Sequence, residues 1–171
     1  DNEGHFVKRD GGKDYYCFAY GNDYRKTLKA FFKISGATPL VPRFALGVWW
    51  SRYHAYSDNE YIELMDRFEK QEIPLTVATI DMDWHWTDLK KEFRIKANGW
   101  TGYSWNTELF KDYKSFLKNL QNRNLKVTLN LHPAEGIRYF EDMYDEVAKA
   151  VGIDPKTKED VKFSCKNDDF W

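Results

Sequence analysis

Cysteine is scarce in this chain. Only two cysteines occur among 171 residues, Cys17 and Cys165, and neither belongs to a CxxC or Cys/His cluster. This count excludes a disulfide scaffold and a zinc framework, and it leaves room for one long-range disulfide. Together with the absence of any Asn-x-Ser/Thr sequence, it favours a cytoplasmic location, although the compartment itself is not determined by the sequence.

A surplus of positive charge and long apolar runs are also missing. The chain has 26 Lys and Arg against 27 Asp and Glu, for a net charge of -1. Without a basic surface to displace phosphate counterions, no nucleic-acid partner is expected. No apolar run approaches the ~18 residues that a membrane helix needs, so no membrane partner is expected either. Hydrophobic residues make up 42% of the chain, which is enough for the core of one domain or part of one.

The first part of the chain predicts a linker, a short strand and a helix. Residues 1–13 are polar, and the aromatic run over residues 15–20 is typical of a strand. Asn22 or Asp23 is a suitable cap for a helix that continues to Ile34, because both side chains accept hydrogen bonds from the first helical turn.

A repeating pattern of strand, loop and helix follows. Near-continuous apolar runs, typical of strands buried on both faces, cover residues 44–50 and 75–81, and residues 125–131 predict a third strand in which apolar and polar residues alternate. Helices are predicted after them, beginning at the capping box of Ser57 and Glu60, at Asp112 and at Ile137, the last continuing to Val151. This repetition predicts an α/β fold with a parallel sheet, either open and doubly wound or closed into a (β/α)8 barrel. The turns lack GxGxxG and Walker A motifs, which argues against the nucleotide-binding open sheets. The loops after the strands are long and aromatic, as in a barrel, where such loops build the site. We therefore expect three of the eight units of a TIM barrel.

Polar side chains follow two of these strands at the end where a barrel builds its binding site. Asp81 ends the second apolar run. In the third strand Thr128, Asn130 and His132 alternate with apolar residues and therefore share a face. Buried carboxylates and amides need partners, so these side chains either bind a ligand or satisfy neighbouring loops.

Two other features leave function open. Asp81 and Asp83 form an Asp-x-Asp pair, which chelates a divalent metal in many glycosyltransferases; Asp83 would otherwise be a turn cap. The tryptophans gather around strand ends and loops, at positions 49, 50, 84, 86, 100 and 105. They either form a platform for sugar rings, as in a non-catalytic sugar-binding module, or pack as a loop core. His54 and His85 lack ligand spacing, so no metal and no cofactor is predicted.

Four ordered segments resemble glycoside hydrolase family 31, the α-glucosidase and α-xylosidase family. They are residues 42–49, 80–84, 99–112 and 125–134. The resemblance implies a retaining α-glycosidase built on a (β/α)8 barrel, in which one carboxylate is the nucleophile and another the acid/base. The family carries the nucleophile at the end of its fourth strand and the acid/base further on, so no catalytic residue is expected in this chain.

The resemblance also implies a set of substrate-binding residues. Asp81 matches the Asp of the second strand, which binds a sugar hydroxyl, and Met82 matches the adjacent pocket-lining position. We add Asn130, His132 and Trp49 at the ends of the neighbouring strands. The family more commonly has an Asp before Pro133, and this departure leaves glucosidase, galactosidase and N-acetylhexosaminidase specificities open.

The same resemblance suggests how the chain is organised and what it binds. Residues 1–20 are expected to be a linker or the end of an N-terminal β-sandwich, and residues 21–171 the N-terminal part of the catalytic barrel. The expected partners are an α-linked oligosaccharide or glycoside and the remainder of the same polypeptide. Three strands leave two open sheet edges, so self-association is also expected, and the chain alone should be inactive.

Overall fold

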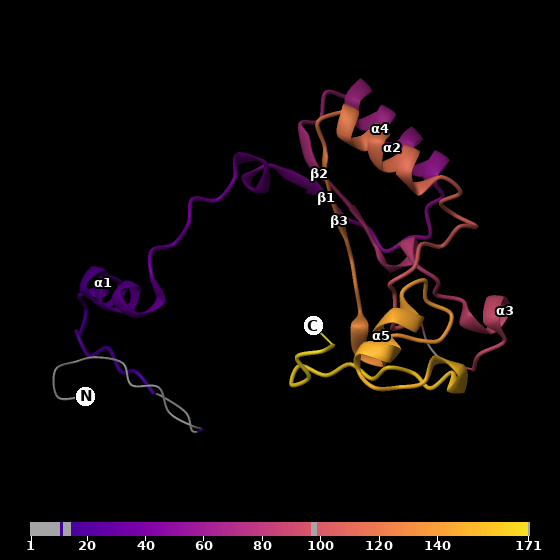
Figure 1. The fold of residues 1–171 in the computed structure, drawn as a ribbon. Helices are drawn as coiled ribbons and strands as arrows, with labels where there is room; N and C mark the ends of the chain where they lie inside the picture. The colour runs from indigo at the N-terminus through magenta and orange to yellow at the C-terminus, as the bar shows by residue number, and fades with distance from the viewer. Residues whose placement is uncertain (1–10, 12–14, 97–98, 171) are drawn as a thin grey trace. The chain divides into compact units, whose positions relative to one another are not determined.

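A computed structural model describes residues 11, 15–96 and 99–170 (Figure 1). The chain divides into two compact units, Asp1–Val41 and Pro42–Trp171. The boundary expected after residue 20 falls within the first unit, before its helix.

The first unit contains the helix α1, Tyr24–Ser35. Asp23 caps it as predicted, because its Oδ1 accepts a hydrogen bond of 3.0 Å from the backbone N–H of Lys26. The strand predicted over residues 15–20 is wrong: this segment is irregular, since no other described segment offers its backbone a ladder. Phe18 instead meets Phe31 edge-on, with ring centroids 6.1 Å apart.

The described part of the second unit contains a parallel sheet in the order β1-β2-β3. Its strands are β1, Val48–Trp50, β2, Leu75–Ile80, and β3, Lys126–Leu129. Register pairs Thr79 with Thr128, and their hydroxyl oxygens lie 2.8 Å apart. The strands and helices alternate as the sequence predicts, and every connection between the strands is a crossover.

The first apolar run is only partly a strand. Its beginning forms a 3-10 helix, η1, Arg43–Leu46, where an extended strand was predicted. The hydroxyl of Thr76 lies 2.9 Å from the carbonyl oxygen of Phe44 and 3.1 Å from that of Val48. A Cβ at Gly47 would lie 2.4 Å from the Thr76 side chain. The bend therefore depends on a polar side chain from β2 and on the small size of Gly47, neither of which hydrophobic periodicity detects.

Two helices cover one face of the sheet. They are α2, Asp58–Lys70, and α4, Tyr113–Asn122, which lie side by side (Figure 1). Both predicted caps are confirmed: Ser57 and Glu60 form the capping box, and Asp112 accepts from the N–H of Ser115 at 3.0 Å. The core between helices and sheet includes Tyr61, Leu64, Met65, Ala78, Ile80, Phe110, Phe116 and Leu120.

The last predicted helix is shorter than expected. Only α5, Tyr144–Ala150, is helical, whereas the prediction began at Ile137. The backbone of Ile137 pairs with Val161 instead, through N–H to O distances of 2.8 and 2.9 Å. The intervening residues contribute buried polar side chains to a loop network, so tertiary contacts override their helical spacing. The remaining short elements are α3, Leu89–Phe93, η2, Met82–Trp84, η3, Pro133–Glu135, and η4, Pro155–Thr157.

Two further expectations concern cysteines and membranes. Cys17, in the first unit, and Cys165, in the second, are both free and exposed. In the part of the chain that the structure describes, no helix combines the length and apolar character of a membrane span.

Candidate functional site

The carboxyl ends of β2 and β3 bring Asp81 and Asn130 together. Ile80 and Leu129 are register partners, so the residues after them emerge at the same edge of the sheet. The Asn130 side-chain amide Nδ2 donates to Asp81 Oδ1 at 2.8 Å. The backbone N–H of Asn130 also continues the ladder, donating to the carbonyl oxygen of Ile80 at 2.9 Å. The two side chains therefore lie together at this edge.

The Asp81 carboxylate is held through one of its two oxygens. Asp81 caps η2, and its Oδ1 also accepts from the backbone N–H of Met82 at 2.7 Å. No described residue hydrogen-bonds Oδ2. The indole Nε1 of Trp84 donates to the Asn130 carbonyl at 2.8 Å, which fixes the other side of the pair. The site therefore presents one oriented carboxylate oxygen as an acceptor for ligand donors.

A cavity of about 490 Å³ opens at this edge. Four of the five predicted binding residues line it, and the complete lining is Tyr53, Asp81, Met82, Thr87, Gly99, Trp100, Asn130 and His132. Trp49 does not line it: this residue lies in β1, and its indole Nε1 donates to the Ala45 carbonyl at 3.2 Å. Tyr53 and Thr87 were not predicted, although both follow strands at the carboxyl edge, which is the signal that identifies such positions.

Aromatic and imidazole groups form one wall of the cavity. The rings of Trp100 and His132 meet edge-on, with centroids 4.7 Å apart. His132 Nδ1 is buried and has no hydrogen-bond partner among the described residues. A half-exposed indole next to a carboxylate and an amide matches the chemistry of a sugar, which has apolar ring faces and hydroxyl edges.

The other loop tryptophans pack against aromatic neighbours. Trp84 is buried, with its ring 5.1 Å from Trp105. Trp105 in turn stacks on Tyr113 at 4.9 Å, and Trp86 meets Phe93 edge-on at 5.6 Å. The loop-core interpretation therefore applies to these residues, and Trp100 is the tryptophan in the cavity lining.

The Asp-x-Asp pair does not act as one unit. Asp81 binds Asn130, whereas Asp83 Oδ1 accepts a hydrogen bond of 2.8 Å from the Thr87 hydroxyl. Among the described residues, no three or more His, Cys, Asp or Glu side chains gather where they could hold a metal ion. Asp83 has the local bonding of a turn-stabilising residue.

His85 lies beneath the loop that carries Trp100. Its ring is completely buried, Nδ1 is 3.1 Å from the carbonyl oxygen of Trp86, and Nε2 has no partner among the described residues. Burial lowers the pKa of His85, and the charges of Glu141 and Asp83 oppose that shift in part. The imidazole is therefore favoured in its neutral form.

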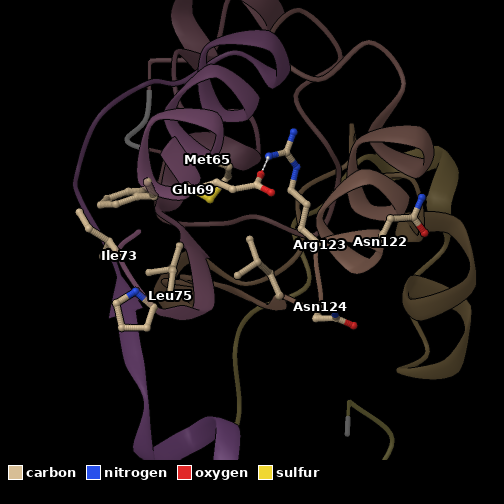
Figure 2. Close-up of a pocket in the computed structure, with 10 residues that line it drawn as sticks. Met65, Glu69, Ile73, Leu75, Asn122, Arg123 and Asn124 are labelled. Carbon is tan, nitrogen blue, oxygen red and sulfur yellow. Dashed lines mark hydrogen bonds and ion pairs between the residues drawn. The ribbon is translucent and has the colours of Figure 1, made fainter. Parts of the chain in front are cut away.

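A second hollow of about 330 Å³ lies at the amino edge of the same sheet (Figure 2). It is lined by the end of α2, the start of β2 and the turn between α4 and β3. Arg123 spans one side of it and pairs with Glu69 at 3.2 Å. None of the predicted binding residues lines this hollow.

Comparison with known proteins decides the family. Residues 38–169 match the model of the glycosyl hydrolases family 31 TIM-barrel domain. The chain belongs to glycoside hydrolase family 31. It is 27% identical over 132 residues to an alpha-xylosidase of Saccharolobus solfataricus, covering 76% of this chain and 17% of that protein. It is also 27% identical over 128 residues to alpha-glucosidase 2 of Bacillus thermoamyloliquefaciens, covering 75% of this chain and 15% of that one.

A solved structure supports the same fold. The family 31 alpha-xylosidase of Xanthomonas citri superimposes with a TM-score of 0.55 at 18% identity, over 77% of this chain and 13% of that one. The predicted fold class, part of a (β/α)8 barrel, is confirmed. This family 31 chain spans less than a fifth of the length of the curated relatives described above.

Proposed function

We propose that this chain forms part of the catalytic barrel of a retaining α-glycosidase and contributes one wall of its sugar-binding site. The observation that carries the proposal is the Asp81–Asn130 pair at the carboxyl edge of a family 31 sheet. Carboxyl-edge loops are where TIM-barrel enzymes bind substrate. The match to an alpha-xylosidase and an alpha-glucosidase supports an α-linked sugar as the substrate.

In this proposal Asp81 binds substrate and is not the nucleophile. Its Oδ1 is occupied by Asn130 and Met82, so Oδ2 is the oxygen that accepts a hydrogen bond from a sugar hydroxyl. A charge-assisted hydrogen bond of this kind orients the ring and strengthens as the sugar approaches the transition state. The nucleophile and the acid/base are proposed to come from later barrel strands, contributed by the remainder of the polypeptide.

The substrate proposal is an α-glucoside, with α-xylosides as the nearest alternative. The test measures release of nitrophenol from nitrophenyl α-glucoside, α-xyloside and α-galactoside by the protein that carries this chain, with the β-glucoside as control. Proton NMR of the first-formed product distinguishes retention from inversion at the anomeric carbon. Absence of hydrolysis of every α-glycoside would contradict the proposal, and an inverted product would contradict the retaining mechanism.

The isolated 171-residue chain is proposed to be inactive and to self-associate. Without a nucleophile and an acid/base, no glycosyl intermediate forms and no leaving group is protonated. Val48, Trp49 and Leu129 of the outer strands are 45%, 46% and 36% exposed, and each outer strand has an open edge. Light scattering and a hydrolysis assay on the purified chain test both statements: a monodisperse monomer contradicts the first, and turnover contradicts the second.

A further inference from the structure

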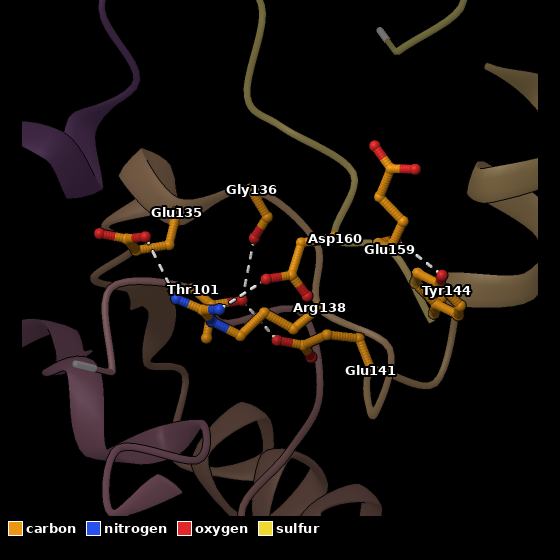
Figure 3. A network of polar contacts seen from close by, with 8 residues as sticks. All are labelled: Thr101, Glu135, Gly136, Arg138, Glu141, Tyr144, Glu159 and Asp160. Carbon is orange, nitrogen blue, oxygen red and sulfur yellow. Dashed lines mark hydrogen bonds and ion pairs between the residues drawn. The ribbon is translucent and has the colours of Figure 1, made fainter. Parts of the chain in front are cut away.

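A buried carboxylate lies beside the cavity without lining it. Glu141 is 5% exposed, and its carboxylate hydrogen-bonds three groups of one loop, of which Figure 3 shows Thr101. Its Oε1 is 2.7 Å from the Thr101 hydroxyl and 3.3 Å from the backbone N–H of Gly102, and its Oε2 accepts from Tyr103 N–H at 3.2 Å. Hydrogen bonds of this number are what a buried carboxylate requires to offset its desolvation.

The loop is tied to the same segment on both sides of Glu141. The N–H of Asp142 donates to Ser104 Oγ at 2.7 Å, and the N–H of Glu135 donates to the Trp100 carbonyl at 2.9 Å. The Thr101 hydroxyl also lies 2.9 Å from the carbonyl oxygen of Gly136. Residues 100–104 therefore follow residues 135–142 closely, with Glu141 at the centre.

The segment that carries Glu141 is itself braced. The Arg138 side chain is 9% exposed and joins Glu135 at 3.1 Å to Asp160 at 2.7 Å (Figure 3). This pair of bonds connects the start of the segment to the chain that follows η4. Glu141 therefore lies in a segment that Arg138 ties to Glu135 and Asp160.

The far side of the loop contacts the cavity wall. Trp100 immediately precedes Thr101, and its ring rests against His132. Gly102 has φ of +129°, and a Cβ there would lie 2.3 Å from the His85 ring. Glu141 thus contacts residues 101–103, whereas the two histidines lie against Trp100 and Gly102, so loss of the carboxylate removes three of the hydrogen bonds that hold the loop.

We propose that Glu141 is a positioning residue: it holds residues 101–103 and thereby fixes Trp100 as one wall of the sugar site. This inference rests on the proposed function for the identity of the ligand. Glu141 does not line the cavity, so its effect on substrate passes through Trp100. It should therefore contribute to binding the sugar rather than to the chemical step.

The first test detects the position of Trp100 without any substrate. The full chain is labelled with 5-fluorotryptophan, and Trp100→Phe identifies the Trp100 line in the ¹⁹F NMR spectrum. Glu141→Gln keeps the side-chain shape but places an NH2 group opposite a backbone N–H, so we expect the Trp100 line to shift and broaden. Asp142→Asn is the matched control, because it removes an exposed charge one residue away and should leave that line unchanged.

A second pair of variants covers the case in which Glu141→Gln fails to fold. Thr101→Val removes the hydroxyl at nearly constant shape, and Thr101→Ser keeps it. We expect Thr101→Val to move the Trp100 line in the same direction as Glu141→Gln and Thr101→Ser to leave it close to the wild-type position. A Trp100 line that is unchanged in Thr101→Val, and in Glu141→Gln where it folds, would overturn the proposal.

The kinetic readout uses the protein that carries this chain and hydrolyses an α-glycoside. Loss of a binding wall that contacts ground state and transition state equally raises KM and leaves kcat unchanged. We expect Glu141→Gln to raise KM about fivefold and to leave kcat within about twofold of wild type, because it weakens a contact made equally in the ground state and the transition state. A fall in kcat at constant KM would overturn the positioning role. If the wild-type protein hydrolyses no α-glycoside, the proposed function fails, and the ¹⁹F spectra still decide the role of Glu141.

Discussion

The two edges of the sheet carry hollows of similar kind but different chemistry. The carboxyl edge has a cavity of about 490 Å³ and the amino edge one of about 330 Å³. At the amino edge the polar groups pair with one another near the surface: Arg123 meets Asp66 at 2.6 Å and Glu69 at 3.2 Å. At the carboxyl edge Asp81 is fixed through a single oxygen by a strand-end amide and a backbone N–H. A hollow is therefore a poor guide to a site, whereas an oriented polar group with unused acceptor capacity is a good one.

The connections at the two edges differ for a related reason. The turns that lead into β2 and β3 end in the left-handed residues Glu72 and Asn124, at φ of 56° and 61°, and each strand begins within a few residues. Such tight turns bring helix ends close to strand starts. The loops after the strands are long and contribute Tyr53, Trp100 and His132 to one cavity.

The largest expected effect is on catalysis at the carboxyl edge. In the protein that carries this chain, Asp81→Asn keeps the bond from Asn130 but loses the charge that accepts a sugar hydroxyl. We expect kcat/KM to fall by about 2–4 kcal/mol, which is ~30- to 900-fold. Steady-state kinetics check this, with circular dichroism to confirm the fold. Asp66→Asn at the amino edge is the control and should leave kcat/KM within about twofold of wild type. Unchanged kinetics in a folded Asp81→Asn protein would remove Asp81 from the site.

The next effect is on stability within the loop network. Gly102→Ala places a Cβ 2.3 Å from the buried His85 ring, at φ of +129°. The energetic costs of the strained backbone and of the overpacked side chain add, so we expect the free energy of unfolding to fall by about 2–4 kcal/mol. Urea denaturation followed by circular dichroism measures it. Gly152→Ala is a matched control, because its φ is +83° with nothing within 4 Å of the new Cβ, so it tests the strain alone and should cost less. Equal losses in the two variants would show that the contact with His85 contributes nothing.

The sequence predicts the parts of this fold that rest on local patterns. The capping box at Ser57 and the cap at Asp112 are each determined by residues a few positions apart, and the structure confirms them. The proximity of Asp81 and Asn130 also follows, because parallel strands share an edge. The helix predicted over residues 137–143 was wrong. The apolar residues of this segment have helical spacing, but its buried polar side chains bind a loop that is distant in the sequence. Likewise the role of Glu141 depends on partners almost 40 residues away, which no local pattern reveals.

A smaller effect is expected in the pH dependence of stability. Burial lowers the pKa of His85 in the folded chain, so the unfolded chain, with an ordinary His pKa near ~6.5, binds more protons at mildly acidic pH. Stability is therefore greatest above that unfolded pKa and falls as pH drops below it toward the folded pKa. We expect a lower free energy of unfolding at about pH 5.5 than at about pH 7.5 in urea titrations.

Two variants assign that dependence to His85. His85→Gln should reduce the difference between the two pH values, whereas His54→Gln, at an exposed position, should retain it. Glu60 and Asp112 are carboxyl groups with a lowered pKa, and they accept hydrogen bonds from Ser57 and Ser115. The stability that they contribute to the fold is lost only at more acidic pH. A full pH difference in a folded His85→Gln variant would locate the titrating group elsewhere.

The smallest expected effect is at the amino edge, and it tests the comparison directly. The Arg123 side chain is 23% exposed, and its partners Asp66 and Glu69 are 58% and 77% exposed. Ion pairs in such solvent contact contribute little, because water and salt screen them and two long side chains must be ordered. We expect Arg123→Gln to lower the free energy of unfolding by less than about 1 kcal/mol, with part of that loss due to its bond to Asn119 at 2.8 Å. A double-mutant cycle with Asp66→Asn isolates the pair, and raising the salt concentration should reduce the coupling energy.

In the protein that carries this chain, Arg123→Gln should leave KM and kcat for hydrolysis within about twofold of wild type. A tenfold or larger rise in KM would show that sugar reaches the amino edge, and the distinction between the two hollows would fail.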